Sequence, residues 1–339
     1  MAKIAIIGTG LIGTSLALAL KDSQLKDLQV VGTDADRLAR SRAEKRKAFD
    51  KVENRLLNAI DGSDIVILAT PVMTMKEVME LIAGELPHGC VVTDVGSSKK
   101  VVLEWANEIL PETVDFVGGH PMAGKEESGP DSAEADLFHD KTYCIIPGAK
   151  TSEQSVSEIT TMVEAIGAVP YFIGVDEHDS FVAAASHLPF LLSTSLVGCT
   201  SKSANWEDIA QLASSGFRDI TRLASGDTVM HRDICITNNQ PIISWIDAFI
   251  KELYEFRNIL ADESGPDSDK VKKVFDDVAD ARAQWLAGQA TVRARLANRQ
   301  REEMPTFAES MGEMVMGRRL LQANKRIFGG LKGQDRDKK

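Results

Sequence analysis

The sequence has few cysteines, and none of them form a pair suited to a metal or a disulfide framework. The four cysteines, Cys90, Cys144, Cys199 and Cys235, are widely spaced and form no CxxC motif. Neither a zinc site nor a disulfide scaffold is therefore indicated. We expect reduced thiols, a cytoplasmic protein and no metal at the functional site.

The chain also lacks an excess of positive charge. Its 339 residues contain 39 lysines and arginines against 50 aspartates and glutamates, which gives a formal net charge of -11. Nucleic acids and anionic membranes are bound by basic patches, so neither is expected as a partner. An anionic small-molecule substrate would need a few cations placed at its binding site.

Transmembrane and targeting segments are not indicated either. No apolar stretch is expected to reach the roughly 20 residues of a membrane-spanning helix. The strand-like run at 3–8 leaves no room for a signal peptide before it. With 43% hydrophobic residues the chain is long enough for two cores, because single cores stop growing near about 250 to 300 residues.

The first half of the chain alternates short β-branched apolar runs with helical patterns. The expected strands cover residues 3–8, 29–34, 64–70, 90–94 and 115–119, with two more at 142–147 and 169–173. This alternation is typical of an α/β, Rossmann-type, doubly wound parallel sheet. We expect this dinucleotide-binding domain to span residues 1–174.

After residue 174 the pattern becomes almost entirely helical, which predicts an all-α substrate and dimerisation domain over 175–328. Apolar residues lie on more than one face of its helices, as between Ile242 and Leu253. The apolar surface of these helices is therefore wider than the single stripe that a surface helix of a monomer buries. We expect a homodimer, in which the additional apolar surface is covered by the second copy. An amphipathic helix is expected over 307–328, and the tail 329–339, rich in Gly, Lys and Asp, is expected to be disordered.

A glycine-rich segment directly after the first expected strand indicates a dinucleotide site. Residues 8–13, GTGLIG, match GxGxxG at the start of a helix, where backbone N–H groups and the helix dipole bind a pyrophosphate. Asp34 ends the second strand, where a carboxylate binds the ribose hydroxyl and disfavours a 2′-phosphate. We therefore expect NAD, with nearby Arg37 weakening the preference over NADP. The expected cofactor contacts are Gly8, Gly10, Leu11, Ile12, Gly13, Asp34, Thr70 and Pro71.

The segment GGHPMAG at 118–124 supplies the candidate catalytic base. Ligands of open α/β sheets bind beyond the carboxyl ends of the strands, and His120 lies at such an end on a backbone restrained by glycine and proline. An imidazole accepts a hydroxyl proton near neutral pH, as a dehydrogenase requires when hydride leaves the carbinol carbon. A histidine that merely satisfies a turn is the alternative.

Two segments of the helical half place polar groups among apolar ones. His187 lies in SHLP at 186–189, and Arg222 ends GFRDITR at 216–222. Buried polar groups are costly unless they are paired or functional, so each of these groups has a functional and a structural interpretation. A helix kink at Pro189 and ion pairing of Arg222 with a nearby aspartate are the structural alternatives.

Together these segments resemble the prephenate and arogenate dehydrogenase family of tyrosine biosynthesis. The resemblance covers about residues 1–282 and includes GTGLIGTS at 8–15, DVGSSK at 94–99, RDI at 232–234 and the three segments described above. It implies NAD-dependent oxidative decarboxylation, either of prephenate to 4-hydroxyphenylpyruvate or of arogenate to tyrosine. His120 would take the proton of the ring 4-hydroxyl, Ser97 would help to position His120, Arg222 would hold the ring carboxylate and His187 would contact the substrate.

The resemblance does not decide between prephenate and arogenate, which differ in the side chain of the substrate. It implies that Glu126 gates or polarises the site, whereas Lys125 departs from the small polar residue expected there. A lysine favours the keto acid prephenate, and the adjacent glutamates favour the amine of arogenate. Two other functions stay open: a β-hydroxyacid-type dehydrogenase, although the lysine motif expected of such enzymes is not found after Gly167, and a non-catalytic NAD-binding regulator.

Overall fold

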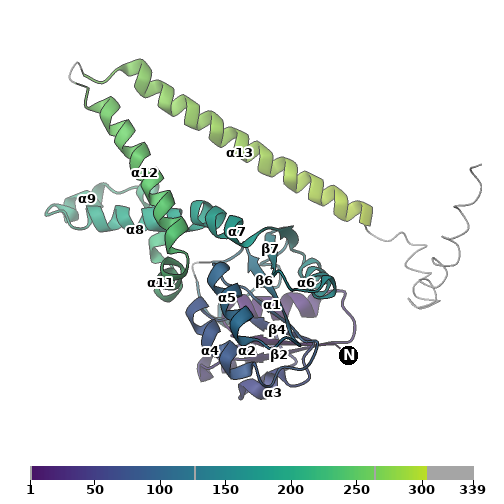
Figure 1. Cartoon of the computed structure of the whole chain (residues 1–339). Helices are drawn as coiled ribbons and strands as arrows, with labels where there is room; N and C mark the ends of the chain where they lie inside the picture. The colour runs from purple at the N-terminus through teal and green to yellow at the C-terminus, as the bar shows by residue number, and fades with distance from the viewer. Residues whose placement is uncertain (1, 126, 263–264, 304–339) are drawn as a thin grey trace, which may run out of the picture. The chain divides into compact units, whose positions relative to one another are not determined.

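The structure is a computed structural model of the chain, and it describes residues 2–125, 127–262 and 265–303. Contacts divide the chain into two compact units, Met1–Asn258 and Ile259–Lys339. The first unit contains an eight-stranded sheet and the helices that follow it (Figure 1).

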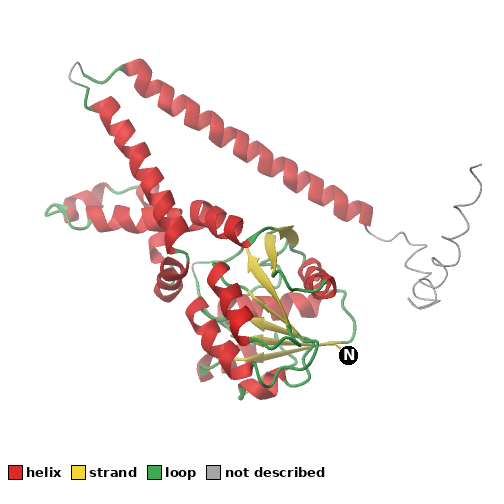
Figure 2. Cartoon of the chain, viewed as in Figure 1, coloured by secondary structure: helices red, strands yellow, loops and turns green. Residues whose placement is uncertain are grey.

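The sheet has the strand order β3-β2-β1-β4-β5-β6-β7-β8. Its strands are the yellow arrows of Figure 2. Its strands are β1 Ala2–Ile7, β2 Leu28–Thr33, β3 Lys51–Glu53, β4 Ile65–Leu68, β5 Val91–Asp94, β6 Asp115–Pro121, β7 Thr142–Pro147 and β8 Val169–Phe172. The chain order reverses between β1 and β4, which is the point where doubly wound sheets bind their ligands.

The last two strands run opposite to the other six. β6 pairs with β7 in antiparallel fashion, and β7 pairs with β8 in parallel. This corrects the expectation of a wholly parallel sheet. Between β6 and β7 the described residues form only the short 3-10 turn η1, Pro130–Ser132, and not the crossover helix that a parallel connection uses. Strand β3 was not predicted because three edge residues are too few to show an alternating pattern.

Helices cover both faces of the sheet, and each face has its own apolar cluster. In β1, Ile4 and Ile6 pack into one cluster, while Ala5 and Ile7 pack into the other. Both faces of the strands are thus buried, which explains why they read as continuous apolar runs. The covering helices are α1 Leu11–Asp22, α2 Arg37–Lys45, α3 Leu56–Ile60, α4 Val72–Ile82, α5 Lys100–Ile109 and α6 Glu153–Ala165.

The rest of the first unit is helical, as the sequence predicted. Its elements are α7 Val175–Val182, the π turn η2 Ala183–His187, α8 Leu188–Thr200, α9 Trp206–Leu212, α10 Ser215–Thr221, the 3-10 turn η3 Arg222–Ser225, α11 Thr228–Thr237 and α12 Asn239–Leu260. Polar contacts join this region to the sheet domain: Ser98 Oγ lies 2.7 Å from Thr237 Oγ1, and the Met73 N–H donates to Asp233 over 3.2 Å.

Elements α7, η2 and α8 form one helical stretch, Val175–Thr200, that is long and apolar enough to cross a membrane by length and composition alone. An apolar stretch of this length was not expected from the sequence. Core helices of soluble proteins meet the same criterion, so it is weak support for a membrane span. The stretch also buries His178, Asp179 and His187, and ionisable groups are costly inside a bilayer.

The second unit contains the long helix α13, Ser268–Glu303. Gly265 and Pro266 lie between α12 and α13, and Gly265 has a φ of +91°. The helix expected over 307–328 and the tail expected over 329–339 lie outside the described residues.

Candidate active site

The loop between β1 and α1 requires glycine at two positions and is open at a third. A Cβ at Gly8, whose φ is +104°, would lie 2.3 Å from the Ala69 carbonyl oxygen, and a Cβ at Gly13 would lie 2.0 Å from that of Gly8. At Gly10, no heavy atom of the described residues lies within 4 Å of such a Cβ. In the described part of the chain no side chain caps α1, so its first-turn N–H groups and dipole can bind a phosphate next to Leu11 and Ile12. The loop therefore fits a dinucleotide.

Asp34 lies at the end of β2 and faces this loop. Its Oδ2 accepts a hydrogen bond from the Thr9 N–H (2.7 Å), and its Oδ1 accepts one from the Asp36 N–H (2.8 Å). A carboxylate has about four acceptor positions, so a ribose hydroxyl can still bind. Arg40 donates to the backbone carbonyls of Asp34 and Ala35, and the expected effect of Arg37 on the preference over NADP stays a prediction.

The loop after β4 completes the cofactor side of the site. The Thr70 Oγ1 is buried and has no hydrogen-bond partner among the described residues. Pro71 follows it as the residue that precedes α4. A buried hydroxyl without a partner is a group that a bound ligand can satisfy, so Thr70 is available for the cofactor contact expected of it.

A fully buried ion pair joins the ends of β5 and β6. The Lys99 ammonium donates to Asp94 Oδ2 and, over 2.9 Å, to the Gly119 carbonyl. Asp94 in turn accepts from the Gly119 N–H (3.1 Å) and the Gly96 N–H (2.8 Å). Buried charges are tolerated when they are paired and hydrogen-bonded in this way. The pair thereby holds both backbone groups of the residue before His120.

His120 lies buried at the end of β6, and only 7% of its surface is exposed. Its Nδ1 is 2.9 Å from Nε2 of His178, which comes from α7. Burial, together with His178, Lys99 and His187, holds the pKa of His120 well below its usual range. The imidazole is therefore neutral at pH 7 and able to accept a proton.

The residues that hold His120 differ from those that the sequence indicated. Ser97 is half-buried in the loop after β5, and within the described part of the chain it makes no hydrogen bond to His120. His178 makes that contact, and Asp179 lies 2.8 Å behind it. The sequence contains the signal, because a His-Asp pair opens an apolar helix directly after β8, but only His187 was selected on this argument.

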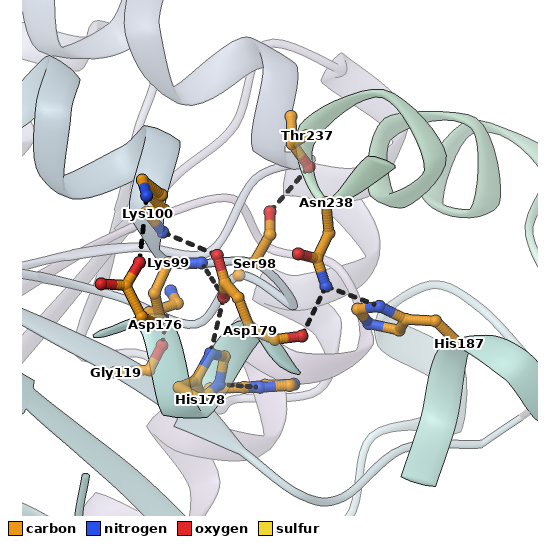
Figure 3. Close-up of polar contacts among 12 residues, drawn as sticks. Ser98, Lys99, Lys100, Gly119, Asp176, His178, Asp179, His187, Thr237 and Asn238 are labelled. Atoms are coloured by element: carbon orange, nitrogen blue, oxygen red, sulfur yellow. Dashed lines mark hydrogen bonds and ion pairs between the residues drawn. The ribbon is translucent and has the colours of Figure 1, made fainter. Parts of the chain in front are cut away.

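His187 is fully buried at the end of the π turn, one residue before α8 begins. Its Nδ1 lies 3.1 Å from the Asn238 amide nitrogen, which also donates to the Asp179 carbonyl over 2.8 Å (Figure 3). Since the amide donates, His187 carries its proton on Nε2, and this atom has no partner among the described residues. Burial lowers the pKa of His187 to about 4.

Arg222 opens η3 and is exposed in the single chain. The next residue, Leu223, packs with Phe190 of α8, three residues after His187. The Ser193 hydroxyl of α8 also donates to the Ile220 carbonyl over 2.5 Å. The GFRDITR segment therefore packs against the helix that begins at His187.

Comparison with known proteins gives the family to which this site belongs. Residues 16–172 match the model of the prephenate dehydrogenase nucleotide-binding domain, and residues 175–276 match that of the prephenate dehydrogenase dimerization domain. The chain is 34% identical over 281 residues to the prephenate dehydrogenase of Bacillus subtilis (strain 168), covering 82% of this chain and 75% of that one. The chain belongs to the prephenate dehydrogenase family.

Two other relatives extend the comparison. The cyclohexadienyl dehydrogenase of Zymomonas mobilis is 33% identical over 264 residues, which is 77% of this chain and 89% of that one. The crystal structure of Aquifex aeolicus prephenate dehydrogenase in complex with hydroxyphenyl propionate and NAD+ superposes with a TM-score of 0.77 and 27% identity, covering 84% of this chain and 98% of that one. The predicted family and fold class are confirmed. These matches give no support to a β-hydroxyacid-type dehydrogenase.

Of the two substrate contacts expected after His120, Lys125 and Glu126, the structure describes only Lys125. The Lys125 ammonium pairs with the Glu134 carboxylate at 2.5 Å and donates to the Ser132 carbonyl over 3.3 Å. A substrate group would have to displace Glu134 to reach it. Glu126 lies outside the described residues.

A separate cavity of about 660 Å³ lies among α5, α7, α11 and α12. Trp105, Asp179 and Asn238 are among its lining residues, whereas the three histidines His120, His178 and His187 are not. We therefore do not assign this cavity to the reaction.

Proposed function

We propose that the protein is an NAD-dependent prephenate or arogenate dehydrogenase that acts in the cytoplasm as a homodimer. One observation carries the proposal: a buried, neutral His120 lies at the carboxyl edge of a sheet whose glycine loop fits a dinucleotide. The names of the relatives, which include prephenate and cyclohexadienyl dehydrogenases, support this substrate class.

His120 has a defined task in the proposed reaction. When bound, NAD supplies the hydride acceptor for the carbinol carbon of the ring. His120 accepts the hydroxyl proton as that carbon becomes a carbonyl. The bond to the ring carboxylate then breaks, CO2 leaves, and the electron pair moves through the ring to the oxygen, which recovers the proton from His120. The histidine thus ends each turnover in its neutral form.

The helical region would supply the groups that bind the substrate. Arg222 would bind the ring carboxylate, since a guanidinium recognises a carboxylate through paired hydrogen bonds. The unpartnered Nε2–H of His187 would donate to a substrate oxygen. Ser97, half-buried at the carboxyl end of β5, would lie beside the nicotinamide. Lys125 and Glu126 would contact the substrate's side chain, where prephenate and arogenate differ.

The homodimer is supported by the apolar surface of α12. Ile250, Leu253 and Tyr254 each expose more than half of their surface in the single chain. Contiguous apolar patches of this kind typically mark interaction sites. The match of residues 175–276 to a dimerization domain points to a second copy of the chain as the partner.

A coupled assay tests the proposed function directly. The purified protein is incubated with NAD and either prephenate or arogenate, and both NADH and CO2 are measured. We expect equal amounts of the two products with at least one substrate. NADH without CO2 would indicate a simple alcohol dehydrogenase. Binding of NAD without turnover of either substrate would favour the non-catalytic regulator.

A further inference from the structure

Two residues outside the expected site, His178 and Asp179, are connected to the catalytic histidine. We propose that they are positioning residues, which hold His120 in the one tautomer that can accept the substrate's proton. The inference rests on the proposed function, because it assumes that His120 is the base. It adds to that function a buried array of three side chains drawn from two parts of the fold.

The array is continuous and closely spaced. His120 Nδ1 lies 2.9 Å from His178 Nε2, and His178 Nδ1 lies 2.8 Å from Asp179 Oδ1. Asp179 also accepts from the Lys99 N–H over 2.8 Å and from the Lys100 N–H over 3.0 Å (Figure 3). These two N–H groups lie at the start of α5, so the carboxylate is anchored to the sheet domain although it belongs to α7.

The protonation of each ring follows from the last member of the array. Burial alone would raise the pKa of Asp179, but hydrogen bonds from His178 and the Lys100 and Lys99 N–H groups outweigh it and hold this pKa below its usual value. An ionised carboxylate only accepts hydrogen bonds, so His178 carries a proton on Nδ1. A neutral imidazole has one donor and one acceptor, so His178 Nε2 accepts from His120 Nδ1. The lone pair of His120 is then on Nε2, the nitrogen left for the substrate.

Because the array is buried, each of its two imidazole rings is restricted to one tautomer. His178 is fully buried, and Asp179 is 3% exposed. With water excluded, the rings lack the solvent partners that would allow either tautomer, and an unsatisfied buried nitrogen is costly. Fixing the tautomer through a second group is the role that the aspartate has in a Ser-His-Asp triad. Here a histidine stands between the carboxylate and the base.

A pair of substitutions at His178 separates this role from a merely structural one. In His178→Phe the acceptor is lost, and we expect kcat to fall by about 100- to 1000-fold, within the usual range for general base catalysis. In His178→Gln the side-chain oxygen can still accept from His120 Nδ1, and we expect kcat to stay within about tenfold of wild type. KM should change little in both, since His178 does not touch the substrate.

Nitrogen NMR of the histidine rings gives a readout that does not depend on activity. The chain has six histidines, so the His120 signals can be assigned by their loss in His120→Asn. We expect His120 to carry its proton on Nδ1 in the wild type and in His178→Gln, and to lose this preference in His178→Phe. Asp176→Asn is the matched control, since Asp176 lies on the same helix in an exposed ion pair with Lys100.

The outcomes decide between the two proposals. A wild-type His120 protonated on Nε2, or a folded His178→Phe with kcat within about threefold of wild type, would overturn the positioning role; threefold is below the smallest effect expected of a lost base. If His178→Phe does not fold, the positioning role is still tested by the His120 tautomer of the wild type and by the kcat and tautomer of His178→Gln. If the wild type oxidises neither substrate, the proposed function fails, whereas the tautomer measurement still tests the array.

Discussion

The sheet domain and the helical region of the first unit differ in how completely a single chain buries them. Two apolar clusters enclose both faces of the sheet. In the described helical region, by contrast, the buried apolar cluster consists of Ala183, Phe190, Ile234 and Ile242. The surface of α12 remains apolar and exposed, and Ile242 is its one buried residue.

The difference in burial indicates that the sheet domain and the helical region contribute to the function in different ways. The sheet domain holds the cofactor loop and His120 on a backbone that is fixed by buried hydrogen bonds within one chain. The helical region presents Arg222 and His187 from helices whose packing is incomplete without a partner. We therefore expect substitutions at His120, and at the α7 residues His178 and Asp179 of the array that contacts it, to change the chemical step. Substitutions at Arg222 or on α12 should instead change substrate affinity or assembly.

The largest effect is expected at the sheet edge, from His120→Asn. Loss of the base should lower kcat by about 1000-fold or more with little change in KM, because the lost interaction forms mainly in the transition state. Steady-state kinetics over a range of pH also tests the protonation. Since burial holds the pKa of His120 well below its usual range, wild-type kcat should be flat through neutral pH and fall only in acid, as His120 gains a proton. That acid limb should vanish in His120→Asn, and near-normal turnover in this variant would refute the assigned role.

The contrast in burial is tested most directly by Leu253→Asp on α12. A charge placed on a buried apolar interface should raise the dimer dissociation constant by about 30-fold or more, since a single central contact often contributes about 2 kcal/mol. Sedimentation velocity at several concentrations measures this change. Lys251→Ala is the control, because Lys251 lies in an exposed ion pair with Glu255 on the same helix and such pairs contribute little. A wild-type protein that sediments as an active monomer would show that the exposed apolar surface of α12 is not a dimer interface.

Arg222→Gln tests whether the helical region binds the substrate. Loss of a charge-assisted hydrogen bond worth about 1.5 to 3 kcal/mol should raise KM by about 10- to 150-fold and change kcat less. Arg218→Gln, one helical turn earlier and also exposed, should have a much smaller effect. An unchanged KM in Arg222→Gln would mean that another cation holds the ring carboxylate.

The smallest effect is expected for cofactor choice in the sheet domain. The wild type should prefer NAD over NADP, and Asp34→Asn should reduce the ratio of the two kcat/KM values by about tenfold, since repulsion of the 2′-phosphate is lost. Asp36→Asn is the control, because its side chain can still cap α2 through the Leu38 N–H. A wild type that prefers NADP would contradict the role of Asp34.

Much of the fold could be predicted from local patterns. Seven of the eight strands were predicted, and the GxGxxG loop was placed correctly, because period, turn residues and glycine requirements are local properties of the chain. The direction of β7 could not be predicted. A buried strand has the same apolar run in either direction, and its orientation depends on whether the preceding connection crosses the sheet.

The candidate site was only partly accessible to sequence reasoning. His120 could be found because it follows a strand in a restrained segment, and strand ends converge at one edge of the sheet. Its partners could not, because His178 lies 58 residues away in the sequence and its ring nitrogen meets His120 only after α7 packs beside α5. The sequence likewise does not indicate that Asp94 and Lys99 form a buried ion pair, because their burial depends on the packing of the strands and helices around them.

The sequence by itself determined the family, the class of cofactor and the candidate for the base, since each depends on residue types in short segments. Only the tertiary structure decided which groups contact that histidine, how close the two buried rings and the carboxylate of the array lie to one another, and which apolar faces remain uncovered. Hydrogen bonds and burial depend on distances in space, and residues separated by 50 or more positions reach those distances only when helices and strands pack together.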